Sequence, residues 1–248
     1  MVCLVLAAGY ATRLYPLTEN FPKPLLKVKE KTILDWLLDD VDGTGSVNRY
    51  IIVSNHRYFD QFQGWVSRKI YSAEVNILDD GSISNETRLG AVNDIQFAMK
   101  TFALDDDLVV LAGDNLLDFS LSGFLAYSQQ KMASCVMRYF EHDVEKLRQA
   151  GVAQVDGRER IIRMEEKPLE PFANWCVPPF YFYRREDLPW VRKAVDCGCG
   201  TDAPGSLVAW LSGMIPVHAM EMPGNRYDIG DFESYQAARE QYPGIMFL

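Results

Sequence analysis

Small residues, an arginine and a lysine lie close together near the start of the chain. They belong to the segment LAAGYATRLYPLTENFPKPLLKV, residues 6–28, which contains Gly9, Arg13 and Lys23. Small side chains let backbone N–H groups approach phosphate oxygens, an arginine can bind two such oxygens at once, and a lysine adds a movable positive charge. The segment is therefore suited to hold a triphosphate, although a strand turn with solvated Arg13 and Lys23 explains the same residues equally well.

Two common phosphate-binding patterns are absent from the sequence. It contains neither G-x-x-x-x-G-K-[ST] nor the dinucleotide pattern G-x-G-x-x-G. A Rossmann dehydrogenase would need the second pattern together with an acidic partner for the ribose. That class of enzyme is therefore disfavoured.

Two aspartates stand where a metal site is expected. Asp114 directly follows the apolar run LVVLAG, so its carboxylate is expected at the tip of a buried strand, and Asp228 lies in RYDIGDFESYQAA. A single Asp at a strand end is more often a turn residue or a helix cap. The residues alone leave both interpretations open.

A third charged group is Met164-Glu165-Glu166-Lys167-Pro168. A lysine beside two acids is usually part of a surface ion pair. On its own this group is therefore weak evidence for a binding site.

Residues 6–28 as a whole resemble the signature LAAGxGTRLxPLTxxxPKPLLxV of the sugar-phosphate nucleotidyltransferase family, which includes glucose-1-phosphate thymidylyl- and uridylyltransferases. The resemblance continues along the chain from Leu4 to about Arg239. It implies an enzyme that transfers a nucleoside monophosphate from an NTP to a sugar 1-phosphate and releases pyrophosphate. It also implies Mg²⁺ as the cofactor.

The resemblance assigns a nucleotide site. Arg13 would contact the β and γ phosphates, and Lys23 would lie near the reacting phosphate. Ala11 stands where the family has a second glycine, and a positive φ at this position would strain an alanine by roughly 1–2 kcal/mol. The residues implied to bind the nucleotide are Leu6, Ala7, Ala8, Gly9, Ala11, Thr12, Leu89 and Gly90.

The identity of the base is less well defined. The segment NETRLGA, residues 85–91, can be aligned with the family's P-x-G-L-A or P-L-G-T-A, in which a glycine near a helix start lets the base lie against the backbone. Arg88 does not determine which base is bound. UTP or dTTP is favoured, and CTP stays open.

Asp114 and Asp228 fall where the family has its magnesium ligands, in L-x-G-D-N and in W-x-D-I-G. Two carboxylates, phosphate oxygens and waters make up the octahedron that Mg²⁺ prefers. Asp231 replaces the family's Thr. Asp118 and Asp231 are near enough in the sequence to be mistaken for ligands.

The resemblance also assigns an acceptor site. Glu166 and Lys167 match the family's V-x-E-K-P, in which the glutamate contacts a sugar hydroxyl and the lysine contacts the acceptor's phosphate. Lys167 is therefore counted with Arg13 and Lys23 among the catalytic residues. Asn115 and Asn174 complete the implied acceptor site.

One departure from the family lies on this side. Pro178-Pro179 replaces the Thr-Gly pair that approaches the sugar, and proline has no N–H to donate. An unusual sugar is one explanation. Alternatively, Trp175 and several tyrosines could enclose a quaternary ammonium group, as in a cytidylyltransferase that acts on phosphocholine or another non-sugar phosphate.

A further alternative is a catalytically weak relative that only binds a nucleotide or a sugar phosphate, which Ala11 and Pro178-Pro179 would fit. The joint presence of three cations and two aspartates argues against it, because a pure binding protein needs no metal pair. The residues that carry this argument are Arg13, Lys23, Asp114, Lys167 and Asp228.

These residues need a framework that brings strand ends together. Residues 2–8 and 50–54 are short apolar runs typical of strands buried on both faces of a parallel sheet, and Ile33, Trp36, Leu37 and Val41 have helical spacing between them. The alternation continues with strands at 74–78 and 108–112, a helix at 90–99, further strands at 134–140, 152–155, 160–165 and 180–183, and a closing helix at 232–242.

The pattern predicts an α/β fold with a doubly wound, mostly parallel, Rossmann-like sheet and a mixed or antiparallel extension. The family implies the same fold, of the nucleotide-diphospho-sugar transferase type. We expect one domain over residues 1–248, with the NTP-binding part in 1–133 and the acceptor-binding part in 134–248. No C-terminal β-helix is expected.

Composition excludes several classes of protein. The 248 residues are 48% hydrophobic and 24% charged, as in ordinary globular proteins, and the net charge of -9 argues against a nucleic-acid partner. No signal peptide or membrane span is expected, and five scattered cysteines do not resemble a disulfide framework or, at Cys197 and Cys199, a zinc site. A cytoplasmic protein is predicted, with a homodimer as the default assembly.

Overall fold

The computed structural model describes residues 1–246, and its contacts divide the chain into two compact units. Unit 1 contains Met1–Arg88, Ala112–Gly123 and the chain from Pro223 on. Unit 2 contains Leu89–Leu111 and Phe124–Met222. The single domain expected from the sequence, with its division after residue 133, stays a prediction.

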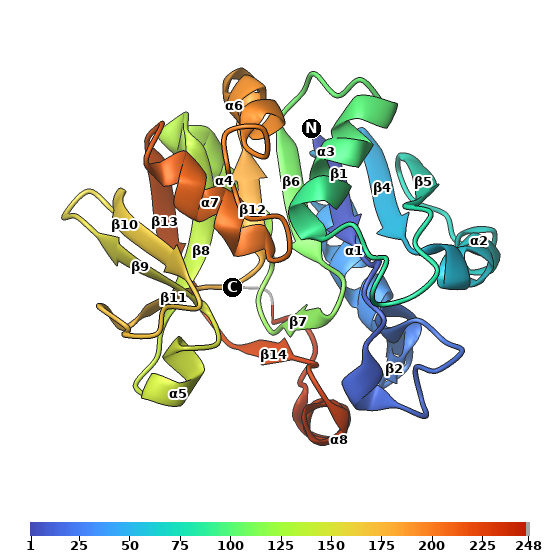
Figure 1. Ribbon diagram of the computed structural model, residues 1–248. Helices are drawn as coiled ribbons and strands as arrows, with labels where there is room; N and C mark the ends of the chain where they lie inside the picture. Colours follow the sequence, from blue (N-terminus) through green and yellow to red (C-terminus); the bar gives the residue numbers. More distant parts are fainter. Residues whose placement is uncertain (247–248) are drawn as a thin grey trace. The chain divides into compact units, whose positions relative to one another are not determined.

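Unit 1 is built around three parallel strands, which lie side by side in blue to cyan in Figure 1. They are β1 (Val2–Leu6), β4 (Arg49–Ser54) and β5 (Glu74–Asp79), with Val2 paired with Arg49 and Arg49 with Glu74. β1 and β4 are almost wholly buried, because their apolar runs fit the two covered faces of a parallel sheet. The strand predicted for residues 2–8 ends at Leu6, where the loop begins.

Three α-helices belong to unit 1: α1 (Ile33–Gly43), α2 (Phe59–Val66) and α8 (Phe232–Gln241). Helix α1 begins with a capping box in which Thr32 accepts from the Asp35 N–H and Asp35 accepts from the Thr32 N–H. The remaining elements are short: η1 (Thr12–Leu14), η2 (Lys23–Leu25), β2 (Lys27–Val28), β3 (Lys31–Thr32), η3 (His56–Tyr58), β7 (Asn115–Leu117) and β14 (Arg226–Asp228).

One apolar cluster holds the functional segments of unit 1 together. Its buried members come from the loop after β1, from α1, from β7 and from the chain around β14 and α8. They are Leu14, Leu26, Val28, Ile33, Leu116, Ile229, Tyr235, Ala238 and Tyr242. Segments more than 200 residues apart in the sequence are therefore fixed by burial of apolar area.

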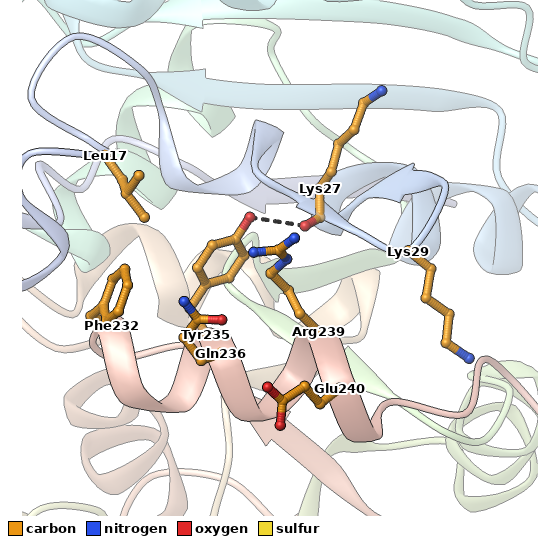
Figure 2. A pocket seen from close by; sticks show the side chains of 8 residues that line it. All are labelled: Leu17, Lys27, Lys29, Phe232, Tyr235, Gln236, Arg239 and Glu240. Atoms are coloured by element: carbon orange, nitrogen blue, oxygen red, sulfur yellow. Dashed lines mark hydrogen bonds between the residues drawn. The ribbon is translucent and has the colours of Figure 1, made fainter.

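Helix α8 also borders a hollow of about 720 Å³, whose other wall comes from residues 17–29 (Figure 2). The Tyr235 hydroxyl donates to the Lys27 carbonyl oxygen over 2.9 Å and ties the helix to β2. None of the site residues predicted from the sequence lines this hollow, whose walls are Leu17, Lys27, Lys29, Phe232, Tyr235, Gln236, Arg239 and Glu240.

Unit 2 contains a mixed sheet. Its strands are β6 (Leu108–Ala112), β8 (Ser134–Phe140), β9 (Gly151–Val155), β10 (Ile161–Glu166), β11 (Trp175–Val177), β12 (Phe180–Tyr183) and β13 (Val217–Glu221). β12 pairs with β6 and β8, β11 pairs with β8 and β9, and β9 pairs with β10, all antiparallel, whereas β13 runs parallel to β8.

Helices in unit 2 are α3 (Ala91–Thr101), α4 (Ser122–Lys131), α5 (Val144–Leu147), α6 (Leu188–Lys193) and α7 (Pro204–Ser212), with the 3-10 turn η4 (Arg185–Asp187). The α/β fold is confirmed, with parallel strands in unit 1 and a mixed sheet in unit 2. No helix within residues 1–246 is long and apolar enough to cross a membrane.

The capping box of α1 yields a stability prediction. Thr32→Ala should lower the free energy of unfolding by about 1 kcal/mol, because the Asp35 N–H loses its acceptor. Urea denaturation followed by circular dichroism measures the change. Thr101→Ala, at the exposed end of α3, is the control and should stay within about 0.5 kcal/mol of the wild type. Equal values for the two variants would contradict the assignment of the cap.

Candidate active site

The loop after β1 has a left-handed residue at its centre. Ala11 has φ 47° and ψ 43°, so the strain anticipated for an alanine at this position is present, at roughly 1–2 kcal/mol. Two contacts fix the strained peptide: the Leu14 N–H and the Thr18 hydroxyl both donate to the Ala11 carbonyl oxygen, over 2.9 and 2.8 Å. The loop thus keeps the shape that a glycine would adopt more easily.

Arg13 lies on the exposed side of this loop. Its neighbour Leu14 is fully buried and anchors η1, while the Arg13 side chain makes no hydrogen bond or ion pair within residues 1–246. A Cβ built on Gly230 would lie 3.8 Å from an Arg13 Nη atom, so the guanidinium lies close to the glycine that follows β14. The charge of Arg13 is available for an anion.

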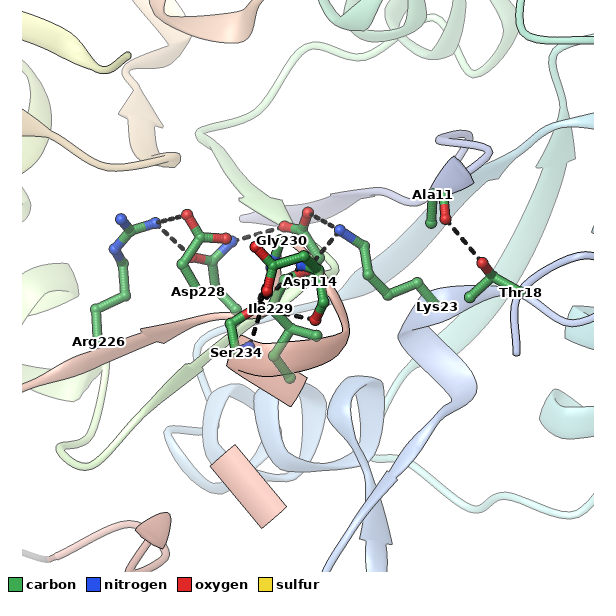
Figure 3. Close-up of polar contacts among 11 residues, drawn as sticks. Ala11, Thr18, Lys23, Asp114, Arg226, Asp228, Ile229, Gly230 and Ser234 are labelled. Atoms are coloured by element: carbon green, nitrogen blue, oxygen red, sulfur yellow. Dashed lines mark hydrogen bonds and ion pairs between the residues drawn. The ribbon is translucent and has the colours of Figure 1, made fainter. Parts of the chain in front are cut away.

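Lys23 connects the loop to both aspartate segments (Figure 3). Its Nζ donates to Asp114 Oδ2 over 2.7 Å and to the Ile229 carbonyl oxygen over 2.8 Å. Partial burial would raise the pKa of the Asp114 carboxyl, but the charge and hydrogen bond of Lys23 and the charge of Arg226 hold that pKa below its usual range. Asp114 is therefore a carboxylate at neutral pH.

The two predicted metal ligands belong to one hydrogen-bonded network. Asn115 Nδ2 donates to Asp114 Oδ1 over 2.7 Å, and Arg226 Nη1 donates to Asn115 Oδ1 over 2.7 Å. The same Arg226 Nη1 donates to Asp228 Oδ2 over 3.2 Å. Asn115 and Asp228 are directly paired across the β7–β14 ribbon, so backbone pairing places the two carboxylates near each other.

The nearby aspartates have structural roles. Asp118 is 2% exposed and accepts from the backbone and side chain of Asn225. Asp231 caps α8 by accepting from the Ser234 N–H. Both carboxylates are thus engaged by contacts within the chain.

Asp114 and Asp228 fit a magnesium site in which the protein supplies only part of the ligands. Within residues 1–246 no cluster of three or more His, Cys, Asp or Glu could hold a metal by itself. Mg²⁺ is commonly held by one or two carboxylates, with substrate phosphates and waters as the other ligands. The magnesium assignment stays a prediction.

Gly90 in unit 2 is required by the packing of its own chain. It has φ +92°, and a Cβ there would lie 2.6 Å from the Thr201 carbonyl oxygen. The first N–H groups of α3, from Ala91 and Val92, donate to carbonyl oxygens of Asp202 and Thr201. The contact of Leu89 and Gly90 with the base stays a prediction.

The acceptor motif lies at the end of β10. Glu166 lies against two glycines, since a Cβ on Gly151 or Gly205 would meet its Oε2 at 2.8 or 1.9 Å. Burial raises the pKa of Glu166, and the charge of Lys167 partly opposes this shift. Lys167 is exposed, with φ 51°, and its N–H donates to the Ala150 carbonyl oxygen.

Trp175 packs against both a cation and an aromatic ring, that of Phe140. The Arg138 guanidinium lies 4.2 Å from the centre of the Trp175 ring, so a cation already covers one face. Asn174 Nδ2 donates to the Glu141 carbonyl oxygen over 2.9 Å and joins two loops.

Pro178-Pro179 form a bulge between β11 and β12. Trp175 pairs with Phe140 and Tyr181 with Val136, so the β11–β12 side has two more residues than β8 over this stretch. The Phe180 N–H closes the turn by donating to the Pro178 carbonyl oxygen over 2.8 Å. The bulge itself therefore offers no proline N–H to a ligand.

Arg226 is the residue that sequence reasoning missed. It contacts Asn115 and Asp228 and influences the pKa of Asp114. Its position two residues before Asp228 was visible in the sequence. Only the pairing of β14 with β7 reveals that its side chain reaches Asn115.

The chain matches the nucleotidyl transferase family model over residues 2–243, and it belongs to that family. The resemblance noted in the sequence is thereby confirmed. A UTP–glucose-1-phosphate uridylyltransferase of Synechocystis sp. is 28% identical over 96% of this chain and 62% of its own length. A glucose-1-phosphate thymidylyltransferase of Streptomyces antibioticus is 28% identical over 79% of this chain and 51% of its own. The chain thus spans less than two thirds of these relatives.

Solved structures share the fold. A UDP-glucose pyrophosphorylase with UDP-glucose has a TM-score of 0.82 at 19% identity, covering 97% of both chains. A UTP-bound UGPase from Acinetobacter baumannii has a TM-score of 0.78 at 17% identity, covering 97% of this chain and 92% of its own. At such identities the likeness establishes the fold alone.

The lowered pKa of Asp114 predicts how stability depends on pH. A carboxyl whose pKa is lower in the folded state contributes stability above its unfolded pKa, roughly 4, and this contribution is lost as the pH falls through the folded pKa. With a chelator present, the wild type should melt at a higher temperature than Asp114→Asn at pH 7, and this difference should shrink below about pH 4.

Thermal melts from pH 3 to pH 7 measure this difference. Asp39→Asn, which removes the partner of Lys31 in a surface pair, controls for the loss of any carboxylate. If the difference in melting temperature between wild type and Asp114→Asn stayed constant from pH 3 to pH 7, the prediction would be contradicted.

Proposed function

We propose that the protein catalyses Mg²⁺-dependent transfer of a nucleoside monophosphate from an NTP to a sugar 1-phosphate, with release of pyrophosphate. The observation that carries this proposal is the network Lys23–Asp114–Asn115–Arg226–Asp228, in which hydrogen bonds link two cations, two carboxylates and the Asn115 amide. Membership of the nucleotidyl transferase family supports it.

The relatives support a sugar 1-phosphate as the acceptor. Their names include glucose-1-phosphate uridylyl-, thymidylyl- and adenylyltransferases, which share the acceptor and differ in the nucleotide. We favour UTP or dTTP as the donor. The covered face of Trp175 gives no support to phosphocholine.

The proposed chemistry is an in-line displacement. An oxygen of the acceptor phosphate forms a bond to the α-phosphorus, the bond from that phosphorus to the bridging oxygen breaks, and the electron pair leaves with pyrophosphate. The nucleophile is already an anion, so no side chain has to remove a proton. Catalysis then depends on alignment and on neutralisation of phosphoryl charge.

Each predicted site residue has a separate role in this reaction. Arg13, exposed beside Gly230, would bind the outer phosphates, and Lys23 would contact the reacting phosphate. Asp114 and Asp228 would hold Mg²⁺, which supplies positive charge to phosphate oxygens when bound. Lys167 in unit 2 would bind the acceptor's phosphate, with Glu166 directed to a sugar hydroxyl.

Asp114→Asn tests the metal assignment. It should keep the fold and lower turnover by about 100-fold or more, because several kcal/mol of charge stabilisation depends on the metal. Pyrophosphate release measures turnover, and Asp39→Asn is the matched control with wild-type rates. Wild-type turnover in purified Asp114→Asn would refute the assignment.

Lys167→Gln tests the acceptor assignment. Loss of a charge-assisted hydrogen bond should raise KM for the acceptor about tenfold, while KM for the NTP changes by less than about twofold. Lys146→Gln, another exposed lysine of unit 2, should leave both constants unchanged. Equal changes in both KM values would remove Lys167 from the acceptor site.

The function as a whole is tested by a substrate matrix. Five NTPs are combined with several sugar 1-phosphates and with phosphocholine, and pyrophosphate release is measured with Mg²⁺ present. Release with UTP or dTTP and one sugar 1-phosphate is expected. Release only with CTP and phosphocholine, or with no pair at all, would overturn the proposal.

A further inference from the structure

Each proposed metal ligand has a cationic side chain beside it (Figure 3). Lys23 Nζ is 2.7 Å from Asp114 Oδ2, and Arg226 Nη1 is 3.2 Å from Asp228 Oδ2. Two positive and two negative side chains therefore neutralise one another. A divalent ion that binds here has to compete with two resident cations.

The two cations are held differently. Lys23 is 12% exposed, and the Ile229 carbonyl oxygen holds it as well as Asp114 does. Arg226 reaches Asp228, whose side chain is 51% exposed, over a longer distance, and shares its guanidinium with Asn115. The contact between Arg226 and Asp228 is therefore the easier of the two for a metal ion to displace.

Displacement has an electrostatic consequence. A guanidinium separated from Asp228 would remain beside a divalent cation, because β14 places Arg226 only two residues from that ligand. The positive charges of the guanidinium and the metal ion would then repel each other strongly, because the site is partly buried. An arginine binds phosphate oxygens in a bidentate manner, so a triphosphate would give the displaced guanidinium a new anionic partner.

We propose that Arg226 is a positioning residue. Its guanidinium pairs with Asp228 in place of the metal until a nucleoside triphosphate binds, and then pairs with a phosphate oxygen of that nucleotide. The inference rests on the proposed function, because it assumes that Asp228 is a metal ligand. Arg226 thereby couples the binding of metal to the binding of nucleotide: each makes the other more favourable. No covalent bond is made or broken in this exchange of ionic partners.

Replacement of Arg226 should separate the two binding events. In Arg226→Gln no charge has to be displaced, so nucleotide-free protein should bind Mn²⁺, used as a paramagnetic probe, about tenfold more tightly than the wild type. Arg226→Lys retains the charge and should bind Mn²⁺ with an affinity close to that of the wild type. Electron paramagnetic resonance of unbound Mn²⁺ measures the dissociation constants.

The matched control is Arg68→Gln, which removes an exposed arginine of unit 1 and should leave the Mn²⁺ affinity within about twofold of the wild type. Thermal melts of each variant report whether the fold is retained. If Arg226 served only to stabilise the ribbon of β7 and β14, Arg226→Gln would melt at a lower temperature without tighter Mn²⁺ binding. Unchanged or weaker Mn²⁺ binding in Arg226→Gln overturns the inference.

A kinetic arm separates failure of this inference from failure of the proposed function. With Mg²⁺ and the active substrate pair, Arg226→Gln should raise KM for the NTP about tenfold and leave KM for the acceptor within about twofold. If the wild type releases pyrophosphate but Arg226→Gln has a wild-type KM for the NTP, only the inference fails. If no substrate pair gives pyrophosphate, the proposed function fails, and the Mn²⁺ titration still decides the role of Arg226.

Discussion

The ion pair between Lys23 and Asp114 is the contact around which the polar network of unit 1 is arranged. It joins the loop after β1 to the turn before β7, and the bond from Lys23 to the Ile229 carbonyl oxygen adds the chain after β14. Lys23 is 12% exposed, so loss of Asp114 would leave the Lys23 charge with little access to water, which costs more than the loss of a surface pair. The apolar cluster around Leu116 and Ile229 keeps these segments in place, and the polar network extends from this pair.

Two predicted site residues adopt a backbone conformation that L-residues seldom use. Ala11 has φ 47° and Lys167 has φ 51°. Each conformation is held by a hydrogen bond from the rest of the chain, through the Thr18 hydroxyl to Ala11 and through the Lys167 N–H to Ala150. Strain of this kind persists where surrounding contacts determine the backbone, and it is concentrated at functional sites.

The acceptor motif in unit 2 combines familiar residues with unusual surroundings. Glu166 and Lys167 keep the family's order, whereas the bulge at Pro178-Pro179 has no proline N–H to donate. Arg138 already covers one face of Trp175, so the aromatic residue is part of a packed cation–aromatic pair. The family's residue order is thus retained at Glu166 and Lys167, and the contact of this region with an acceptor stays a prediction.

The sequence by itself determined the family and the alternating α/β elements, and it predicted the residues of the site. Continuous apolar runs predicted β1 and β4, because strands buried on both faces need apolar residues at every position. Only the tertiary structure could reveal that Arg226 and Asn115 link Asp114 to Asp228, since 111 residues separate Asn115 from Arg226 and no local pattern encodes their pairing. The short elements β7 and β14 were missed for the same reason: three residues carry too little periodicity, and each strand is stabilised by its distant partner.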